Sequence, residues 1–489
     1  MSDVNRIRVR FAPSPTGFLH VGGLRTALYN FLFARKNRGV FVLRIEDTDR
    51  SRHVDGAVEN LIEVLRWAGL DYDEGPRRDG PFGPYVQSQR LDIYKGKVDD
   101  LLANGRAYRC FCSQERIDEV RRQQEKLGLQ KKYDRHCLGL SETEIRNNLG
   151  NNVPSVVRMK IPDATTVRLH DIIRGEVHFS SEMLDDQVLL KSDGYPTYHL
   201  ANVVDDHLME ISHVIRGEEW LSSTPKHVLL YQFFGWDLPQ FAHLPLLLNP
   251  DRTKLSKRQG DVAVEDYRAK GFLSDALVNF VALLGWNPGH EREFFNLNEL
   301  INEFSLDDVN KAGAIFNVEK LTWLNFQHLK SKPDTEVLHM LRKVLAQSKY
   351  RNVQVGDAYL LSVIRVMRDR MTFVGDILER SPYFFEPPTG YDPEGVTKRW
   401  NRDTPLQLRA LVEEFSKLQQ PAQQDFEAAL HRTAESLKVA NGTLIHPVRL
   451  AVSGTSGGPG LYDILFILGK EVSIERINTA IERIGANGK

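Results

Sequence analysis

His20 lies in a segment whose residue types suit nucleotide chemistry. The stretch RFAPSPTG (residues 10–17) precedes the tetrapeptide HVGG (residues 20–23). Glycines at a helix start leave bare backbone whose N–H groups favour an anion. An imidazole beside them can stabilise charge that builds on a phosphate. A purely structural histidine is the alternative that this segment alone leaves open.

A basic loop far downstream is the second chemical signal. Residues 254–258 read KLSKR, after an expected strand at 244–248 and a turn at 249–251. A lysine on such a loop neutralises charge on the β- and γ-phosphates of a nucleotide. Taken alone, the loop is more typical of a solvated basic surface. Together the two segments predict one triphosphate site divided between distant parts of the chain.

The residues around His20 follow the pattern of a β-loop-α-β unit. Ile7, Val9 and Phe11 alternate with polar residues, which predicts a half-buried strand. Apolar positions within 24–32 recur with helical spacing, and 40–45 is an expected buried strand. Such a unit opens a parallel nucleotide-binding sheet. The predicted fold class is therefore α/β, with ligands at the carboxyl end of the first strand.

Residues 107–186 interrupt this rhythm. They contain an expected polar helix at 113–127 and a short strand at 156–161. We interpret them as an α+β insertion between two halves of the sheet. Sheet signals resume with an expected core strand at 211–215, which ends at Arg216.

Beyond residue 330 the pattern changes to amphipathic helices, expected at 337–345, 358–378 and 406–418. The glycine-rich stretch 453–460 matches neither a P-loop nor a dinucleotide fingerprint. We interpret it as a flexible connection between helices.

Length and composition exclude several classes of protein. A chain of 489 residues exceeds a single core, which predicts two to four domains. A 41% hydrophobic and 26% charged content, without a signal-peptide pattern or a membrane-length apolar run, predicts a cytoplasmic protein. The net charge of -1 gives no global sign of nucleic-acid binding, which instead depends on local basic patches such as 121–136.

Three cysteines exclude a disulfide framework in a chain of this length. Cys110 and Cys112 are separated by one residue, and Cys137 follows. Thiolates spaced in this way can bind a metal ion. Ordinary reduced thiols are the alternative interpretation.

Four motifs in order carry a resemblance to a known family. They are PSPTG (13–17) with HVGG (20–23), then RIEDTD (44–49), then KLSKR (254–258). This set resembles the class I aminoacyl-tRNA synthetases, specifically the bacterial glutamyl-tRNA synthetases, and the similarity runs the full length. Gly23 stands where the general class I signature has a second histidine. Small residues at this position are usual in the glutamyl branch, so Gly23 favours that branch within class I.

The resemblance implies a reaction. Glutamate and ATP give glutamyl-adenylate and pyrophosphate with Mg²⁺, and the glutamyl group then passes to the terminal adenosine of tRNA-Glu. His20 and Lys257 are the implied stabilisers of the transition state, with Lys254 assisting. The implied ATP-binding set is Gly17, His20, Gly22, Gly23, Lys254, Ser256, Lys257 and Arg258.

The resemblance also implies a glutamate pocket. Arg10 and Arg216 suit carboxylates and Glu46 suits the α-ammonium group. An arginine at a strand end is also typical of a surface ion pair. Glutamine would leave one guanidinium poorly paired, which favours glutamate. The remaining implied pocket residues are Ala12, Ser14, Tyr198 and Asn202.

Some family members hold zinc with a similar cysteine pattern. Three thiolates need a fourth ligand for tetrahedral zinc. Members that carry the metal can supply it two residues after the last cysteine, where this chain has Gly139. Tyr133 and His136 are the candidates that remain.

The implied layout has four parts. A Rossmann-like catalytic domain (1–106 and 187–259) holds an acceptor-binding insertion (107–186). A stem-contact region (260–330) and an all-helical anticodon-binding module (331–489) follow. The implied chain is a monomer that binds ATP, L-glutamate and tRNA-Glu.

Three related functions are alternatives. The paralogue that glutamylates queuosine in a tRNA lacks the helical module, and the carboxyl-terminal part of glutaminyl-tRNA synthetase is β-barrel. A catalytically inactive tRNA-binding homologue would not need His20, Lys257, Glu46 and Arg10 intact. The choice between tRNA-Glu alone and tRNA-Gln as well depends on anticodon contacts that the motifs do not place.

Overall fold

The computed structural model describes residues 6–52, 54–255 and 263–485. These residues form two compact units. The first contains residues up to 270 together with 274–321, and the second contains 271–273 together with the chain from 322 onward. Ser256, Lys257 and Arg258 of the basic loop lie outside the described residues.

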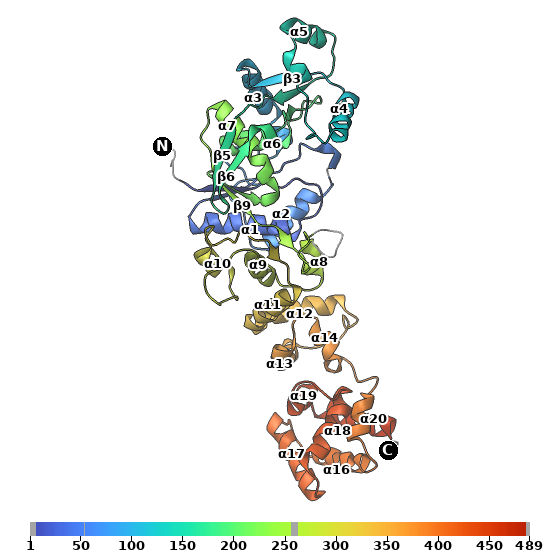
Figure 1. Cartoon of the computed structure of the whole chain (residues 1–489). Helices are drawn as coiled ribbons and strands as arrows, with labels where there is room; N and C mark the ends of the chain where they lie inside the picture. Colours follow the sequence, from blue (N-terminus) through green and yellow to red (C-terminus); the bar gives the residue numbers. More distant parts are fainter. Residues whose placement is uncertain (1–5, 53, 256–262, 486–489) are drawn as a thin grey trace. The chain divides into compact units, whose positions relative to one another are not determined.

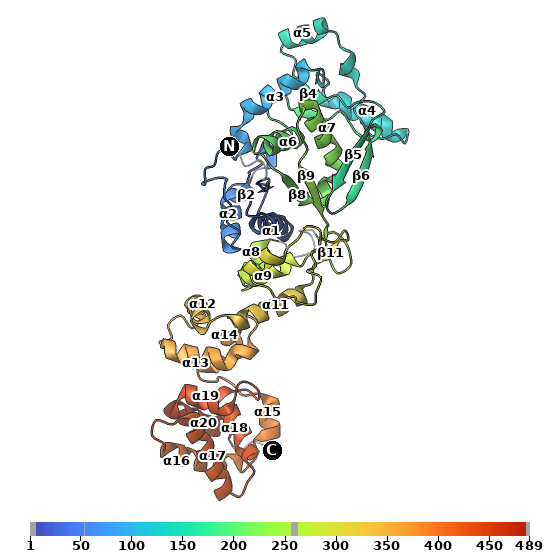
Figure 2. The ribbon, with the colours of Figure 1, turned by 90° about the vertical axis from the view of Figure 1, so that its left-hand side faces the viewer.

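The first unit is built on a six-stranded sheet in the order β2-β1-β8-β9-β5-β6 (Figures 1 and 2). Neighbours pair in parallel from β2 through β5, and β6 pairs with β5 in antiparallel fashion. This confirms the predicted α/β class. The strands are β1 (Arg8–Phe11), β2 (Val40–Leu43), β5 (Thr166–Asp171), β6 (Gly175–Ser180), β8 (His213–Gly217) and β9 (Gln240–Leu244).

Strand β1 differs from the half-buried strand that its alternation predicted, because all four of its residues are buried. A central strand of a parallel sheet is covered on both faces. Its polar positions are occupied by Arg8, which is paired with Glu74, and Arg10, which is paired with Asp206. The polar residues that alternate along β1 are therefore buried and ion-paired, and they do not mark a face exposed to solvent.

The chain reverses its direction of travel across the sheet at β1. Helix α1 (Val21–Lys36) connects β1 to β2 on one side, whereas β8 lies on the other side of β1. Ligands of open parallel sheets bind beyond the carboxyl ends of the strands at such a reversal. The fold therefore locates the expected site next to Phe11 and Gly217, where β1 and β8 end.

A smaller antiparallel sheet of three strands, β3-β4-β7, lies within the same unit. The membership of the two sheets does not follow the insertion that was expected at 107–186. Strands β5 and β6 come from inside the expected insertion yet extend the large sheet, and β7 comes from beyond it yet joins the small one. The elements here are β3 (Ala107–Cys110), β4 (Val156–Met159), β7 (Val188–Leu190), α3 (Leu91–Ala103), α4 (Gln114–Lys126) and α5 (Glu142–Gly150).

The strand expected at 244–248 is divided between the end of one strand and a second, short strand. Strand β9 ends at Leu244, Pro245 follows, and β10 (Leu247–Leu248) pairs in parallel with β11 (Ala314–Ile315). Proline lacks a backbone donor, which explains the interruption. The other helices of this unit are α2 (Ala57–Trp67), α6 (Tyr198–Leu208), α7 (Thr224–Phe234), α8 (Val264–Ala269), α9 (Ser274–Ala282) and α10 (Leu297–Glu303).

The second unit is helical throughout its described residues, as predicted. The single helix expected at 358–378 is divided, because the Asp376 carboxylate accepts hydrogen bonds from the backbone of Thr372 and Phe373 and begins a new helix. The stretch 453–460 connects α18 to α19. The helices are α11 (Val318–Ser331, which begins in the first unit), α12 (Asp334–Gln347), α13 (Asp357–Met367), α14 (Asp376–Arg380), α15 (Pro393–Arg399), α16 (Thr404–Ser416), α17 (Gln423–Ser436), α18 (Asn441–Ser453), α19 (Leu461–Leu468) and α20 (Lys470–Ile484).

The core of the second unit is apolar and contains large aromatic side chains. Trp400, Phe415 and Phe426 are fully buried, and the rings of the two phenylalanines pack edge to face at 5.1 Å. Among the described helices of the whole chain, none is long and apolar enough to cross a membrane.

A buried carboxylate, Asp205 of α6, joins α6 to the segments beside it. Its Oδ1 accepts from Arg90 Nε at 2.7 Å, and its Oδ2 accepts from Gln87 Nε2 at 2.9 Å and from the Tyr94 hydroxyl at 2.8 Å. Arg44 Nε lies 3.8 Å from the same Oδ2. Both guanidinium groups are buried, and Asp205 is the ion-pair partner that the structure shows for Arg90.

We expect the substitution Asp205→Asn to destabilise the first unit by about 3 kcal/mol, because it removes the carboxylate that pairs with the buried Arg90. Urea or thermal unfolding measures the loss. Asp100→Asn is the matched control: it breaks the exposed Lys97–Asp100 pair on α3, and exposed pairs contribute less than about 1 kcal/mol. Equal stability of the two variants would contradict this account.

Candidate active site

A cleft of about 570 Å³ lies at the carboxyl ends of β1 and β8. Its volume falls in the range of small-molecule sites. The structure brings together every sequence-predicted ATP and glutamate residue that it describes. Those that line the cleft are Arg10, Ala12, Ser14, Gly17, His20, Gly22, Gly23, Glu46, Tyr198, Asn202, Arg216 and Lys254.

His20 caps the amino terminus of α1. Its Nδ1 accepts a hydrogen bond from the Gly23 backbone N–H at 3.2 Å, and the side chain is exposed at the cleft. A Cβ at Gly22 would meet the imidazole ring at 3.0 Å, and one at Gly23 would meet Leu19 Cδ1 at 2.6 Å. The absence of side chains at Gly22 and Gly23 therefore leaves space for the side chains of His20 and Leu19. The His20 imidazole is thereby held at the amino terminus of α1.

The two ends of the basic loop are anchored beside this helix terminus. Leu255 donates from its backbone N–H to Leu247 O at 2.9 Å, and Val264 donates in the same way to Leu19 O at 2.9 Å. Lys254 lines the cleft. Segments distant in sequence therefore meet at one site, as the division of the triphosphate motifs predicted.

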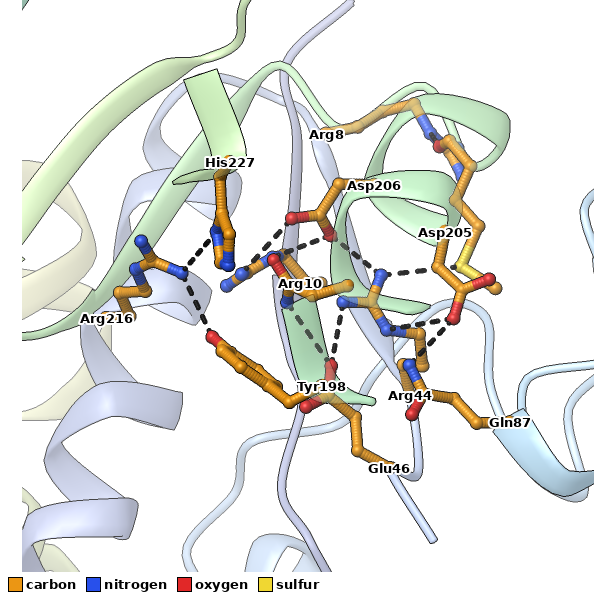
Figure 3. Close-up of polar contacts among 12 residues, drawn as sticks. Arg8, Arg10, Arg44, Glu46, Gln87, Tyr198, Asp205, Asp206, Arg216 and His227 are labelled. Atoms are coloured by element: carbon orange, nitrogen blue, oxygen red, sulfur yellow. Dashed lines mark hydrogen bonds and ion pairs between the residues drawn. The ribbon is translucent and has the colours of Figure 1, made fainter. Parts of the chain in front are cut away.

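Four charged side chains form a buried network at the floor of the cleft (Figure 3). Asp206 accepts from Arg10 Nε at 3.0 Å and from Arg44 Nη1 at 2.7 Å. Arg44 Nη2 in turn donates to Glu46 Oε1 at 3.0 Å. Arg10, expected to bind a carboxylate of the ligand, thus already has a carboxylate partner within the protein.

The network shifts the pKa values of its two acids in opposite directions. Burial raises the pKa of Glu46, and the neighbouring Arg44 and Arg10 offset only part of that effect. Burial acts on Asp206 in the same sense, but Arg10 and Arg44 outweigh it and lower the pKa of Asp206. Asp206 is therefore a permanent counter-ion, whereas Glu46 gains from a further positive group such as an ammonium ion.

Asn202 completes the link between Glu46 and Asp206. In one orientation its amide donates to Glu46 Oε1 at 3.3 Å. In the other it donates to Asp206 Oδ2 at 3.3 Å and accepts from Arg44 Nη2 at 3.1 Å, which satisfies both ends of the amide. Either way the side chain lies over the charged floor.

Arg216 has a different environment from Arg10 and Arg44, which pair with carboxylates. Its guanidinium donates to the Tyr198 hydroxyl at 3.0 Å, to Thr224 Oγ1 at 2.9 Å and to the Trp220 carbonyl at 3.5 Å. Two imidazoles also bond to it: His227 Nδ1 at 3.2 Å, as Figure 3 shows, and His243 Nε2 at 3.1 Å.

The three histidines around Arg216 are neutral. Burial lowers the pKa of His227 well below its usual value, with Arg216 adding to the effect, and burial also lowers the pKa of His243. His199, whose Nδ1 lies 3.1 Å from His227 Nε2, has its pKa lowered by burial to about 3. Arg216 consequently has hydrogen-bond acceptors but, among the described residues, no ion pair.

A buried guanidinium without a counter-ion is a binding site for an anion. Tyr198 accepts from Arg216, so its own O–H remains able to donate to a ligand. Figure 3 shows both side chains at one end of the charged floor, with Glu46 at some distance along it. The arrangement suits a molecule that carries a carboxylate at one end and an ammonium group further along.

Asp206 and Asp205 were not predicted from the sequence. Helical spacing offers a signal for Asp206, because positions 198, 202 and 206 recur every four residues on one face of α6. Trp220, which lines the cleft and packs on Tyr198 with ring centroids 4.2 Å apart, had no such signal.

The cysteines form a cluster beside β3. The Sγ atoms of Cys110, Cys112 and Cys137 all lie within 4.8 Å of one another. The Tyr133 hydroxyl lies 3.3 Å from Cys110 Sγ and 3.4 Å from Cys112 Sγ. Three sulfurs and one oxygen give four potential donor atoms, which is the number that a tetrahedral zinc site needs.

Of the two candidates for the fourth ligand, only Tyr133 is in place. Its hydroxyl is buried among the thiols and also accepts from the Cys137 backbone N–H at 2.9 Å. His136 is exposed and is not part of the cluster. Burial first, and then hydrogen bonds with the cysteines, raise the pKa of Tyr133.

Two family models together match nearly the whole chain. Residues 6–323 match the catalytic domain of class I tRNA synthetases (E and Q), and residues 324–481 match an anticodon binding domain. The boundary between the models falls close to the division between the two compact units.

Individual relatives are similar over their full length. The chain is 55% identical to a glutamate–tRNA ligase of Chloroherpeton thalassium and 54% identical to one of Chlorobaculum parvum, each over 98% of both chains. A crystal structure of a glutamate–tRNA ligase from Elizabethkingia meningosepticum in complex with its amino acid is 41% identical, with a TM-score of 0.94 over 98% of this chain and 100% of that one. The chain belongs to the glutamate–tRNA ligase family of class I tRNA synthetases.

Proposed function

We propose that the chain activates L-glutamate with ATP and transfers the glutamyl group to the 3′-terminal adenosine of tRNA-Glu. The observation that carries this proposal is Arg216, a buried guanidinium that lines the cleft, donates to the hydroxyl of the cleft residue Tyr198 and has no ion pair among the described residues. Family membership supplies the reaction, and Arg216 supplies the preference for an acidic side chain.

The cleft has complementary groups for both ends of glutamate. The γ-carboxylate binds Arg216 and the Tyr198 hydroxyl, and the α-ammonium group binds Glu46. Arg10, Ala12, Ser14 and Asn202 complete the pocket. Glutamine would bring an uncharged amide to Arg216 and leave the guanidinium without an anion, which costs binding energy in a buried site.

ATP occupies the part of the cleft next to the amino terminus of α1. Its phosphates face the backbone of Gly22 and Gly23, whose N–H groups carry the positive end of the helix dipole. His20 donates to the α-phosphate as the amino acid carboxylate attacks it in line. In the proposed site Gly17 and the motif residues Lys254, Ser256, Lys257 and Arg258 also bind ATP, and Mg²⁺ bound with ATP would neutralise part of the phosphate charge.

The second unit supplies the anticodon-binding part of the proposed complex, in line with its family model. The small sheet with its helices contacts the acceptor end, and residues 260–330 contact the stem. The helical structure of the second unit argues against the glutaminyl alternative, whose corresponding part is β-barrel. The cytoplasmic location and the monomeric state expected from the sequence stay predictions.

We expect Arg216→Gln to lower kcat/KM for glutamate at least about 100-fold, because a desolvated charge pair is lost. ATP–pyrophosphate exchange, with and without tRNA, measures it, and the KM for ATP is expected to stay unchanged. Arg77→Gln, which removes an arginine from an exposed pair with Glu59, is the control. An unchanged preference for glutamate over glutamine would refute the pocket assignment. Failure of the unaltered chain to charge tRNA-Glu while still binding it would indicate an inactive homologue.

The substitution His20→Asn separates the two roles of this residue. Asparagine is a good helix cap, so the stability of α1 is kept. The imidazole donor is lost, and we expect the rate of glutamate activation to fall about 100-fold. His20→Ala serves as comparison, since it should lose the same rate and in addition about 1 kcal/mol of stability. Full activity of the asparagine variant would exclude a chemical role for the imidazole.

We also propose that Cys110, Cys112, Cys137 and Tyr133 hold one Zn²⁺ ion. The ion would join the end of β3 to the loop that carries Tyr133 and Cys137, a structural role that fits a site with four protein ligands and no open position. The small sheet would then depend on the metal for part of its stability.

Metal analysis of the purified chain is expected to find one zinc per molecule, and chelation to lower the thermal stability. Tyr133→Phe removes only the phenolic oxygen, so zinc should be lost to a chelator more readily. Tyr108→Phe is the matched control: this neighbouring buried tyrosine bonds to Asp186 at 2.8 Å instead of to the thiols. A metal-free chain, or equal zinc retention by the two variants, would show that the cysteines are ordinary thiols.

A further inference from the structure

Arg216 is connected through His243 to a buried carboxylate that does not reach the cleft. Asp171 Oδ2 lies 2.6 Å from His243 Nδ1, and Arg216 Nε donates to His243 Nε2 at 3.1 Å. The side chains of Asp171 and His243 are fully buried, and neither residue lines the cleft. The three residues come from the neighbouring strands β5, β9 and β8.

The contacts from Asp171 through His243 to Arg216 determine which ring nitrogen of His243 carries the proton. Although burial opposes it, the hydrogen bond from His243 helps to lower the pKa of Asp171, so the carboxylate is ionised and only accepts. His243 Nδ1 must therefore carry the proton. Because the ring is neutral, its Nε2 presents a lone pair to the Arg216 Nε–H.

Asp171 is itself held rigidly. Its Oδ1 accepts from the backbone N–H groups of Ile173 at 3.0 Å, Arg174 at 2.9 Å and His243 at 3.3 Å. These bonds leave Oδ2 for the imidazole. On the sheet, Arg216 and His243 are direct partners in the β8–β9 register.

We propose that Asp171 and His243 are positioning residues for glutamate recognition: Asp171 selects the His243 tautomer that orients the Arg216 guanidinium toward the substrate's γ-carboxylate. This inference rests on the proposed function, in which Arg216 binds that carboxylate. A neutral imidazole is suited to the task, since it fixes the direction of the guanidinium without cancelling its charge. A carboxylate in direct contact would orient Arg216 equally well but would compete with the substrate.

The substitution Asp171→Asn tests the tautomer with almost no change in shape. The amide oxygen of the introduced asparagine keeps the backbone hydrogen bonds, so its N–H₂ group faces His243 Nδ1 and forces the proton to Nε2. The new Nε2–H can then donate to Thr224 Oγ1, which lies 3.1 Å away, and the Arg216 Nε–H loses its acceptor on His243. We expect the KM for glutamate in aminoacylation by the full chain to rise about 10- to 100-fold. The KM values for ATP and tRNA-Glu are expected to stay unchanged.

The direction of the change separates positioning from simple electrostatics. Removing the negative charge of Asp171 leaves the neighbourhood of Arg216 more positive, which alone would strengthen carboxylate binding and lower the KM for glutamate. A rise in the KM for glutamate therefore indicates a change in the orientation of the Arg216 guanidinium. A lower KM would therefore overturn the proposal.

A matched control lies on the same hairpin. Glu176 Oε1 bonds to His170 Nδ1 at 2.7 Å, and both side chains are exposed. Glu176→Gln thus alters the same kind of pair away from the cleft and is expected to leave the KM for glutamate unchanged. A rise equal to that of the Asp171 variant would attribute the effect to the hairpin and overturn the proposal.

His243→Asn provides a second variant if Asp171→Asn impairs folding. The amide introduced at this position still donates to Asp171 but does not extend to Arg216, so the glutamate KM should rise without a buried carboxylate being left unpaired. Unchanged KM values in both folded variants would refute the positioning role. If Arg216→Gln retains a normal glutamate KM, the proposed function fails instead, so the two failures are distinguishable.

Discussion

The positive charge of Arg216 is the constraint around which the cleft is organised. A buried ion is costly unless it is paired, yet pairing this one within the protein would remove its value for binding a carboxylate. The structure meets both demands with neutral acceptors: a phenol, a hydroxyl, a backbone carbonyl and two imidazoles. They satisfy the hydrogen bonds of the guanidinium and leave its charge available. Depressed pKa values keep the imidazoles uncharged, so they do not repel it.

Four other buried arginines serve the opposite purpose. Arg8, Arg10, Arg44 and Arg90 each have a carboxylate partner, and their pairs join β1, β2, α6 and the segment before α3. These pairs build a rigid charged floor, on which Asn202 and Glu46 are fixed. The same residue type thus has two roles in adjacent positions, and only the identity of the partner distinguishes them.

The sequence contained much of this arrangement. The α/β class and the helical second unit followed from strand and helix periodicity, and the expected residues of the cleft followed from the four motifs and the family resemblance that they carry. The interaction partners of these residues could be predicted less well from the sequence, because they depend on tertiary contacts. Arg10 and Arg216 both stand near strand ends, and nothing local to either residue shows that Asp206 pairs with the first and no described carboxylate with the second. The pairing of β5 with the large sheet was missed for the same reason, since strand periodicity does not identify the neighbour of a strand.

The mixed origin of the two sheets limits how this enzyme can be recombined with its relatives. A graft that exchanged residues 107–186 as one cassette would carry β5 and β6 out of the large sheet, and Asp171 with them. The recipient would then depend on the donor's strands to complete its own amino acid pocket. Junctions that follow the sheets would instead fall before β3 and between β4 and β5, and β7 would be exchanged as a second segment because it pairs with β4. The boundary that matters for exchange is therefore set by strand pairing and not by the position of the insertion in the sequence.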